Sequence, residues 1–160
     1  MRRRQFMTLL GGAAAWPLAA RAQQALPLVG VLFGGTAQRD GYGMAALRKG
    51  LSETGFVEGK NVEILHLGAE WHYDRLAALA TELVRRRVAV IFALWNVPAL
   101  AAKSATGMLP VVFSVGGDPV ELGLVARLNH PDANVTGAYL LSAALVQKRL
   151  IGGNNERARI

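Results

Sequence analysis

The stretch Val88-Ala89-Val90-Ile91-Phe92-Ala93 decides the fold, because it is a continuous apolar run with a proline, Pro98, shortly after it. A run of this length is typical of a strand with both of its faces covered. Such strands occur in parallel sheets, where helices pack on both faces. The run therefore predicts an inner strand of an α/β domain, followed by a helix that has Pro98 in its first turn.

The alternation of apolar runs with amphipathic segments continues on both sides of this strand. Four further strands are predicted, at Leu28–Phe33, Asn61–Leu67, Pro110–Ser114 and Asn134–Tyr139, the second of them from side chains that alternate between the two faces. Apolar residues at helical spacing predict helices from Met44 to about Gly55, from Tyr73 to Arg86, from Pro98 onward, from about Pro119 to Leu128 and from about Ser142 onward. This rhythm predicts an α/β fold with a doubly wound, mostly parallel, Rossmann-like sheet.

Length and composition fit one compact domain. The chain has 160 residues, of which 52% are hydrophobic, which is enough for one core and too short for two full domains. It contains no cysteine, so a disulfide framework, a thiolate metal site and a cysteine nucleophile are all excluded.

The first 22 residues have the pattern of a secretory signal peptide. Arg2-Arg3-Arg4 precedes a short apolar stretch, Phe6 to Leu18, and Ala20-Arg21-Ala22 places small residues where a signal peptidase reads them. We expect cleavage before Gln23 and a periplasmic mature protein. The alternative is a permanent membrane anchor, although the apolar stretch is short for a bilayer span. Arg3-Arg4-Gln5-Phe6 also resembles a twin-arginine signal, while the run of three arginines suits the general secretory route.

The formal net charge of +7 does not indicate nucleic-acid binding. Four of the 18 basic residues lie in the leader, which leaves 14 basic against 11 acidic residues, or about +3. The only internal basic run is Arg85-Arg86-Arg87, which is typical of the solvated last turn of a helix. We therefore expect no nucleic-acid partner.

The chain divides into three predicted segments. These are the leader at 1–22, an α/β lobe at 27–150 and an atypical tail at 151–160. The tail opens with Gly152-Gly153-Asn154-Asn155, which breaks the preceding helix, and it carries no apolar face. A truncated or frame-shifted gene is our hypothesis for this end of the chain.

A ligand site is predicted where the strands end. In doubly wound sheets, ligands bind outside the carboxyl ends of the strands. Four loops at these ends collect hydroxyls, an amide, aromatic rings and helix N-termini, which suit a small polar organic ligand. The candidate ligand-binding residues are Thr36, Tyr42, Trp95, Asn96, Ser114, Asp118 and Tyr139. Packing against a helix is an equal alternative for Trp95, and Asp118 is expected to cap a helix, with or without a ligand contact.

No catalytic or metal site emerges from the sequence. Gly41-Tyr42-Gly43-Met44-Ala45-Ala46 fits a dinucleotide pattern, but it begins too far beyond the strand for the strand-to-helix turn that the pattern requires. The three histidines have no carboxylate at ligand spacing, and no nucleophile-and-base arrangement is visible. We expect no enzyme activity, no cofactor and no metal.

Several segments together resemble a known family. They include Leu47-Arg48-Lys49-Gly50-Leu51 with Gly55-Phe56-Val57-Glu58-Gly59-Lys60-Asn61-Val62, Asp74-Arg75-Leu76, Asp118-Pro119-Val120-Glu121-Leu122-Gly123 and Asn134-Val135-Thr136-Gly137. In this order and at these spacings, the chain from Met1 to about Leu150 resembles the substrate-binding proteins of ABC transporters whose better-known members bind tryptophan and other aromatic amino acids. Leu94-Trp95-Asn96-Val97 departs from the small polar segment usual at that place in the family.

The resemblance implies a fold, a function and a partner. The fold would be one lobe, the N-terminal one, of a type I periplasmic binding protein, whose members run to about twice this length. The function would be capture of a small-molecule solute, an amino acid or an aromatic compound, for an ABC permease. Two alternatives stay open: a single-lobe nucleotide-binding or enzymatic α/β domain, and a nonfunctional remnant of a binding-protein gene.

Overall fold

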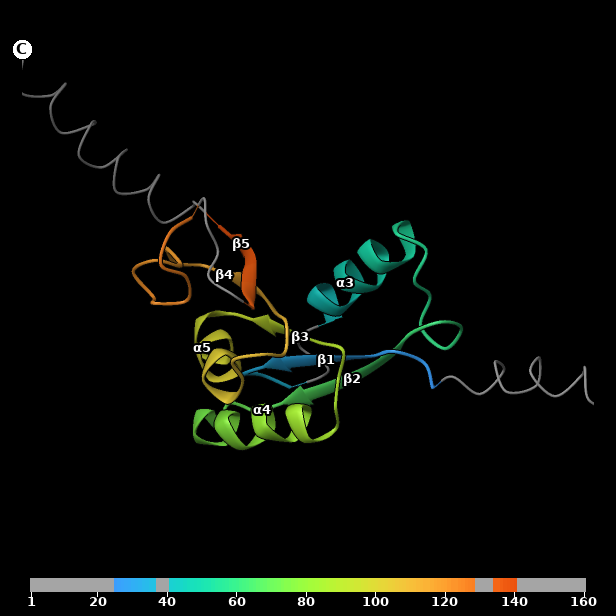
Figure 1. Cartoon of the computed structure of the whole chain (residues 1–160), viewed down its shortest axis with the longest axis horizontal. Coiled ribbons are helices and arrows are strands. Elements are labelled where there is room, and N and C mark those ends of the chain that lie inside the picture. Colours follow the sequence, from blue (N-terminus) through green and yellow to red (C-terminus); the bar gives the residue numbers. More distant parts are fainter. Residues whose placement is uncertain (1–24, 37–40, 129–133, 141–160) are drawn as a thin grey trace, which may run out of the picture.

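A computed structural model describes residues 25–36, 41–128 and 134–140 (Figure 1). Within them lies a five-stranded sheet of β1 (Leu28–Phe33), β2 (Glu63–Gly68), β3 (Val90–Leu94), β4 (Val111–Val115) and β5 (Val135–Tyr139). The strands lie in the order β2-β1-β3-β4-β5, and all neighbours are parallel. The predicted α/β class and the predicted strands are confirmed, with small shifts of the strand ends.

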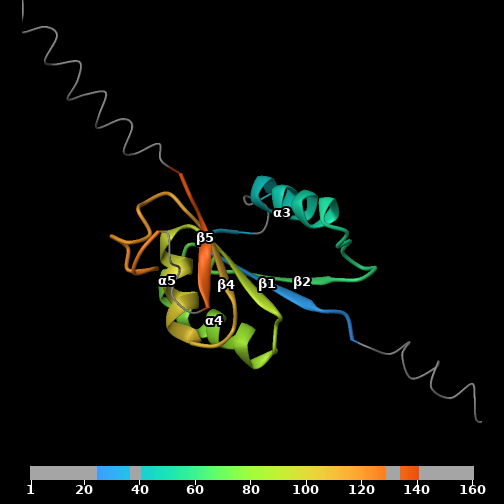
Figure 2. The same cartoon turned by 45° about the horizontal axis from the view of Figure 1, so that its top comes forward.

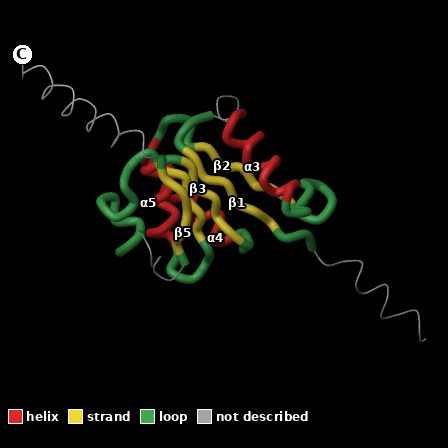
Figure 3. The backbone as a smooth tube through the Cα atoms, turned by 90° about the horizontal axis from the view of Figure 1, so that it is seen from above, coloured by secondary structure: helices red, strands yellow, loops and turns green. Residues whose placement is uncertain are grey.

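Helices pack on both faces of the sheet, as predicted. Helix α3 (Gly41–Glu53) lies on one face, while α4 (Leu76–Arg85) and α5 (Asn96–Ala105) lie on the other (Figures 1 and 2). The view from above shows the strands side by side between these helices (Figure 3). The predicted helix from Tyr73 begins as the 3-10 turn η2 (Tyr73–Arg75) and becomes α-helical at Leu76.

The inner strand β1 contributes side chains to two hydrophobic cores. Val31 and Phe33 pack in a cluster with Met44 of α3, whereas Leu32 packs in a cluster with Leu83 of α4 and α5 residues. Successive side chains of a strand point to opposite faces, so a strand between two helical layers needs apolar residues at every position. Each large side chain fully buried in this way contributes about 1.5–3 kcal/mol.

The connection from α3 to β2 is held by one asparagine and a left-handed glycine. Gly55, at φ 89°, ends the helical segment as predicted. The side chain of Asn61 then closes the loop on itself: its Nδ2 donates to Gly55 O at 2.8 Å, and its Oδ1 accepts from Val57 N at 2.7 Å.

The predicted helix from about Pro119 to Leu128 is wrong. The segment forms a turn in which the backbone N–H of Leu124 donates to Pro119 O at 2.8 Å. Gly123 has a φ of 70°, which a right-handed helix does not accommodate, and its carbonyl accepts from Lys103 Nζ at 2.6 Å. The turn buries Leu124 and Val125 in the larger core, so the apolar spacing that resembled a helix serves a turn instead.

Three predicted features lie outside the described residues. These are the leader at 1–22, the helix from about Ser142 and the tail at 151–160. Among the described residues, no helix is both long and apolar enough to cross a membrane.

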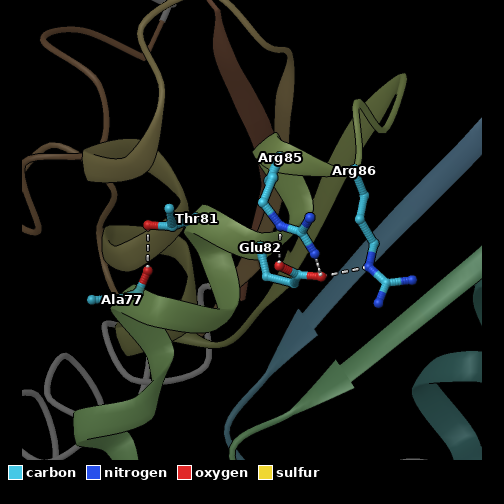
Figure 4. A network of polar contacts seen from close by, with 5 residues as sticks. All are labelled: Ala77, Thr81, Glu82, Arg85 and Arg86. Carbon is cyan, nitrogen blue, oxygen red and sulfur yellow. Dashed lines mark hydrogen bonds and ion pairs between the residues drawn. The ribbon is translucent and has the colours of Figure 1, made fainter.

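The basic run Arg85-Arg86-Arg87 lies at the end of α4, as predicted, and two of its residues, Arg85 and Arg86, pair with one carboxylate. Glu82 accepts from Arg85 Nε at 2.7 Å and from Arg86 Nε at 2.6 Å (Figure 4). Hydrogen bonds from Arg85 and then from Arg86 lower the pKa of Glu82 to about 2. A carboxylate pKa that is lower in the folded state stabilises the fold above the unfolded-state pKa, and this contribution is lost as the pH falls.

We expect Glu82→Gln to lower the melting temperature slightly at pH 7, because the amide cannot form the charged pairs. The difference from the wild-type chain should shrink as the pH falls from about 5 toward 2, since Glu82 then becomes protonated. Thermal unfolding followed by circular dichroism across this range measures it. Glu53→Gln, whose ion pair with Lys49 is long at 3.9 Å, is the control. A Glu82→Gln effect independent of pH would contradict the assignment.

Candidate functional site

The sheet has a switch point between β1 and β3. These strands are hydrogen-bonded neighbours, yet the chain leaves β1 toward α3 on one face and leaves β3 toward α5 on the other. The two connections diverge and open a crevice at the carboxyl ends, the place where doubly wound folds bind ligands. A pocket of about 600 Å³ lies there, within the size range of small-molecule sites.

The pocket is lined by four loops. They follow β1, β2, β3 and β4, and their described lining residues are Phe33, Gly34, Gly35, Thr36, Trp71, Tyr73, Trp95, Asn96, Val97 and Gly116. None of these residues is charged. The described lining is therefore mainly aromatic and apolar, with polar groups supplied by Thr36, Tyr73, Asn96 and the backbone.

Three aromatic side chains stand partly exposed around the pocket. Trp71, Tyr73 and Trp95 are 53%, 49% and 58% exposed. Trp71 and Tyr73 come from the loop after β2, and Trp95 comes from the loop after β3. Exposed aromatic rings that line one pocket are suited to stacking on a flat or apolar ligand.

The glycines after β1 make room for these rings. A Cβ built on Gly34 would lie 2.6 Å from Tyr73 Cε1, and one on Gly35 would lie 3.1 Å from Trp71 Cζ2. The β1 and β2 loops also pair through the backbone, since Trp71 N donates to Gly34 O at 2.7 Å. The absence of side chains at Gly34 and Gly35 therefore lets the aromatic loop lie directly on the β1 loop.

The dinucleotide-like pattern Gly41–Ala46 does not form a phosphate-binding turn at the end of β1. Gly41 is the first residue of α3, so the pattern Gly41–Ala46 lies in the helix rather than in the turn between β1 and the helix. This agrees with the interpretation made from the sequence.

Asn96 joins the third and fourth loops. Its Oδ1 accepts from Gly116 N at 3.1 Å, which leaves the Nδ2 group as the polar atom that can face a ligand. Asn96 and Val97 begin α5 and line the pocket. Because the first N–H groups of a helix have no partner within it, this end of α5 favours a carboxylate or another polar group that accepts hydrogen bonds.

The structure brings together only some of the predicted site residues. Thr36, Trp95 and Asn96 line the pocket, whereas Ser114, Asp118 and Tyr139 are not among its lining residues. Asp118 caps a turn, because its Oδ1 accepts from Val120 N at 2.7 Å, and Tyr139 packs against the larger core. The side chain of Tyr42 lies outside the described part of the chain.

Trp71 and Tyr73 were not predicted from the sequence as site residues. The four loops predicted to form the site do not include the loop after the second strand. A signal was present, because Trp71-His72-Tyr73 places three ring-bearing residues in the loop that follows a strand.

Most of the chain matches a known protein family. The family described as ABC transporter substrate binding protein matches residues 39–151, well over half of the chain. The chain belongs to this family. The predicted resemblance is thereby confirmed.

Individual relatives agree with this assignment. The chain is 33% identical over 89 residues to a protein named tyrosine-binding protein from Clostridioides difficile (strain R20291), a match that spans 56% of this chain and 26% of that protein. Among solved structures, a conserved domain protein from Vibrio cholerae superposes with a TM-score of 0.71 at 30% identity, over 79% of this chain and 43% of that chain.

A further solved structure of this kind contains an amino acid. It is an ABC domain in complex with L-Trp from Streptococcus pneumoniae, with a TM-score of 0.66 at 26% identity over 72% of this chain and 39% of that chain. The chain spans less than half the length of each of these three relatives.

The close approach of the β1 and β2 loops is testable at Gly68. A Cβ there would lie 2.6 Å from Gly35 O, a backbone atom that cannot move alone. We expect Gly68→Ala to lower the free energy of unfolding by about 1–3 kcal/mol, measured by urea denaturation.

Gly50→Ala is the matched control for this substitution. Gly50 lies within α3 with nothing within 4 Å of its Cβ position, so alanine should stabilise the helix by about 0.5–1 kcal/mol. Equal effects of the two substitutions would show that the loops do not lie as close as described.

Proposed function

We propose that this chain is a solute-binding component of an ABC transporter and that it captures a small aromatic or amino-acid solute at the carboxyl edge of its sheet. The observation that carries the proposal is the uncharged pocket at the switch point, with three aromatic rings around it and the N-terminus of α5 in its wall. Two relatives point to the same ligand class, one being named for tyrosine and the other holding L-Trp.

The aromatic part and the carboxylate of such a ligand each have a place in the pocket. The aromatic or apolar part would stack among Trp71, Tyr73 and Trp95, where ring faces attract flat groups. A carboxylate would lie at the start of α5, near Asn96 Nδ2 and the helix N–H groups, and Thr36 would add a hydroxyl. Contacts from Ser114, Asp118, Tyr139 and Tyr42 remain part of the proposal, although these residues are not among the described residues that line the pocket.

The role implies binding without chemistry. Among the described residues, no group of three or more histidine, cysteine, aspartate or glutamate side chains is placed to hold a metal ion, and the described pocket lining has no charged acid or base. Such a lining is suited to binding and releasing a solute. The partners would be the solute and an ABC permease, the latter by analogy with the family.

Ligand binding is tested by isothermal titration of the purified chain. We expect L-tryptophan and L-tyrosine to bind and L-lysine and ATP not to, because the described lining offers rings but neither a counter-charge nor a phosphate cradle. We expect an affinity weaker than micromolar, because one lobe alone would surround less of the ligand than a closed pair of lobes would. Sub-micromolar binding would contradict this geometry, and binding of ATP alone would favour the nucleotide-binding alternative.

Trp71→Ala provides the matched variant for this titration. Its ring lies over Gly35 and lines the pocket, so its loss should weaken binding of both aromatic amino acids about three- to tenfold. Phe56→Ala is the control, because Phe56 is similarly exposed, at 45%, but does not line this pocket.

We further propose that the chain is exported, with residues 1–22 as the leader and 27–150 as the α/β lobe. Expression in a Gram-negative host should yield a periplasmic protein whose first residue, by N-terminal sequencing, is Gln23. Replacing Arg3 and Arg4 together by lysine should block export if the twin-arginine route is used and should leave it intact if the general secretory route is used. An uncleaved chain in the membrane fraction would support a permanent anchor.

A further inference from the structure

Trp95 has a backbone conformation that residues other than glycine rarely adopt. Its φ is 74° and its ψ is 169°, in a region that is populated almost only by glycine. Such a conformation is unfavourable for a residue with a Cβ and persists only when the surrounding structure imposes it. A large aromatic residue at such a position calls for a physical reason.

The surrounding structure fixes the backbone on both sides of this residue. Trp95 N donates to Ser114 O at 2.8 Å, and Trp95 O accepts from Ala99 N at 3.2 Å. The next residue is fixed as well, because Asn96 Oδ1 accepts from Gly116 N at 3.1 Å. Strand β4, helix α5 and the loop after β4 therefore hold Trp95 in the unfavourable conformation.

Burial of the ring does not compensate for this conformation. The side chain is 58% exposed, and the ring lies at the pocket rather than in either core. Among the described residues, the non-glycine residues with positive φ are Glu70, Trp71, Trp95 and Arg87. The first three lie at this edge of the sheet, in the loops after β2 and β3, so unfavourable backbone is concentrated at the pocket.

We propose that Trp95 is the residue that sets the preference of the pocket for aromatic over aliphatic solutes, and that its ring is retained there despite the backbone conformation. This inference rests on the proposed function. Its ring is the aromatic surface that stands at the N-terminus of α5, so a ligand whose carboxylate lies at that helix end places its side chain against the indole. An aliphatic side chain would gain burial there but no stacking.

The test is the ratio of dissociation constants for L-leucine and L-tryptophan, measured by titration of the whole chain. In Trp95→Gly this ratio should fall about three- to tenfold relative to the wild-type chain, because tryptophan loses its stacking partner. The melting temperature of the ligand-free variant should hold or rise, because glycine adopts this backbone without strain. Trp95→Leu is the second variant, in case the glycine variant does not fold. It keeps a large apolar side chain without an aromatic ring, and we expect it to lower the ratio in the same way.

Phe56→Ala is the control in which the ratio should not change. An unchanged ratio in both Trp95 variants would overturn the inference while leaving the proposed function intact. Equal weakening of both ligands together with a lower melting temperature would also overturn it, since general damage to the pocket has that signature. A wild-type chain that binds neither amino acid would overturn the proposed function, and this inference with it.

Discussion

Strand β1 is hydrogen-bonded to β2 on one side and to β3 on the other, and both of its faces are covered by helices. Because the chain departs in opposite directions after β1 and after β3, the sheet cannot be closed over at its carboxyl end between these two strands. The pocket follows from this constraint. The cores, the helix positions and the opening are consequences of one strand order, β2-β1-β3-β4-β5.

The lining of the opening depends on a second constraint, the close approach of neighbouring loops. The β2 loop lies on the β1 loop because Gly34, Gly35 and Gly68 carry no side chains where Tyr73, Trp71 and the backbone of Gly35 pass. Glycines after the first strand of an α/β fold often suggest a phosphate cradle. Here they admit aromatic rings, and the same residue type thus supports a pocket of opposite chemical character.

Much of the fold could be predicted from the sequence, because β1, β3 and β4 are mostly apolar runs and helices with apolar spacing lie between the strands. The segment Pro119–Leu128 could not, since its helical spacing of apolar residues is overridden by Gly123 at positive φ and by the burial of Leu124 and Val125 in a turn. Asn61 and Asn134, which are part of the family resemblance, stabilise loops through hydrogen bonds to the backbone. Asn134 Nδ2 donates to Leu109 O at 2.7 Å and so ties the start of β5 to the residues after α5.

The site could be predicted only in part. Thr36, Trp95 and Asn96 follow directly from strand ends, and the pocket includes them. Trp71 lies in a loop in which Glu70 and Trp71 itself have positive φ, and neither residue type signals such backbone in a sequence. Asp118 was weighed as a cap or a ligand contact, and its carboxylate is occupied by backbone N–H groups of a turn rather than of a helix.

The central claim, that the aromatic edge of the sheet is the binding surface, is tested most directly by NMR. The chain has three tryptophans, Trp16, Trp71 and Trp95, whose indole N–H signals can be assigned by single replacement with phenylalanine. In the mature chain, which begins at Gln23 in our proposal and therefore lacks Trp16, we predict that titration with L-tyrosine, which adds no indole signal, shifts the signals of both Trp71 and Trp95. Saturating ligand that leaves the signals of both Trp71 and Trp95 unmoved would contradict it.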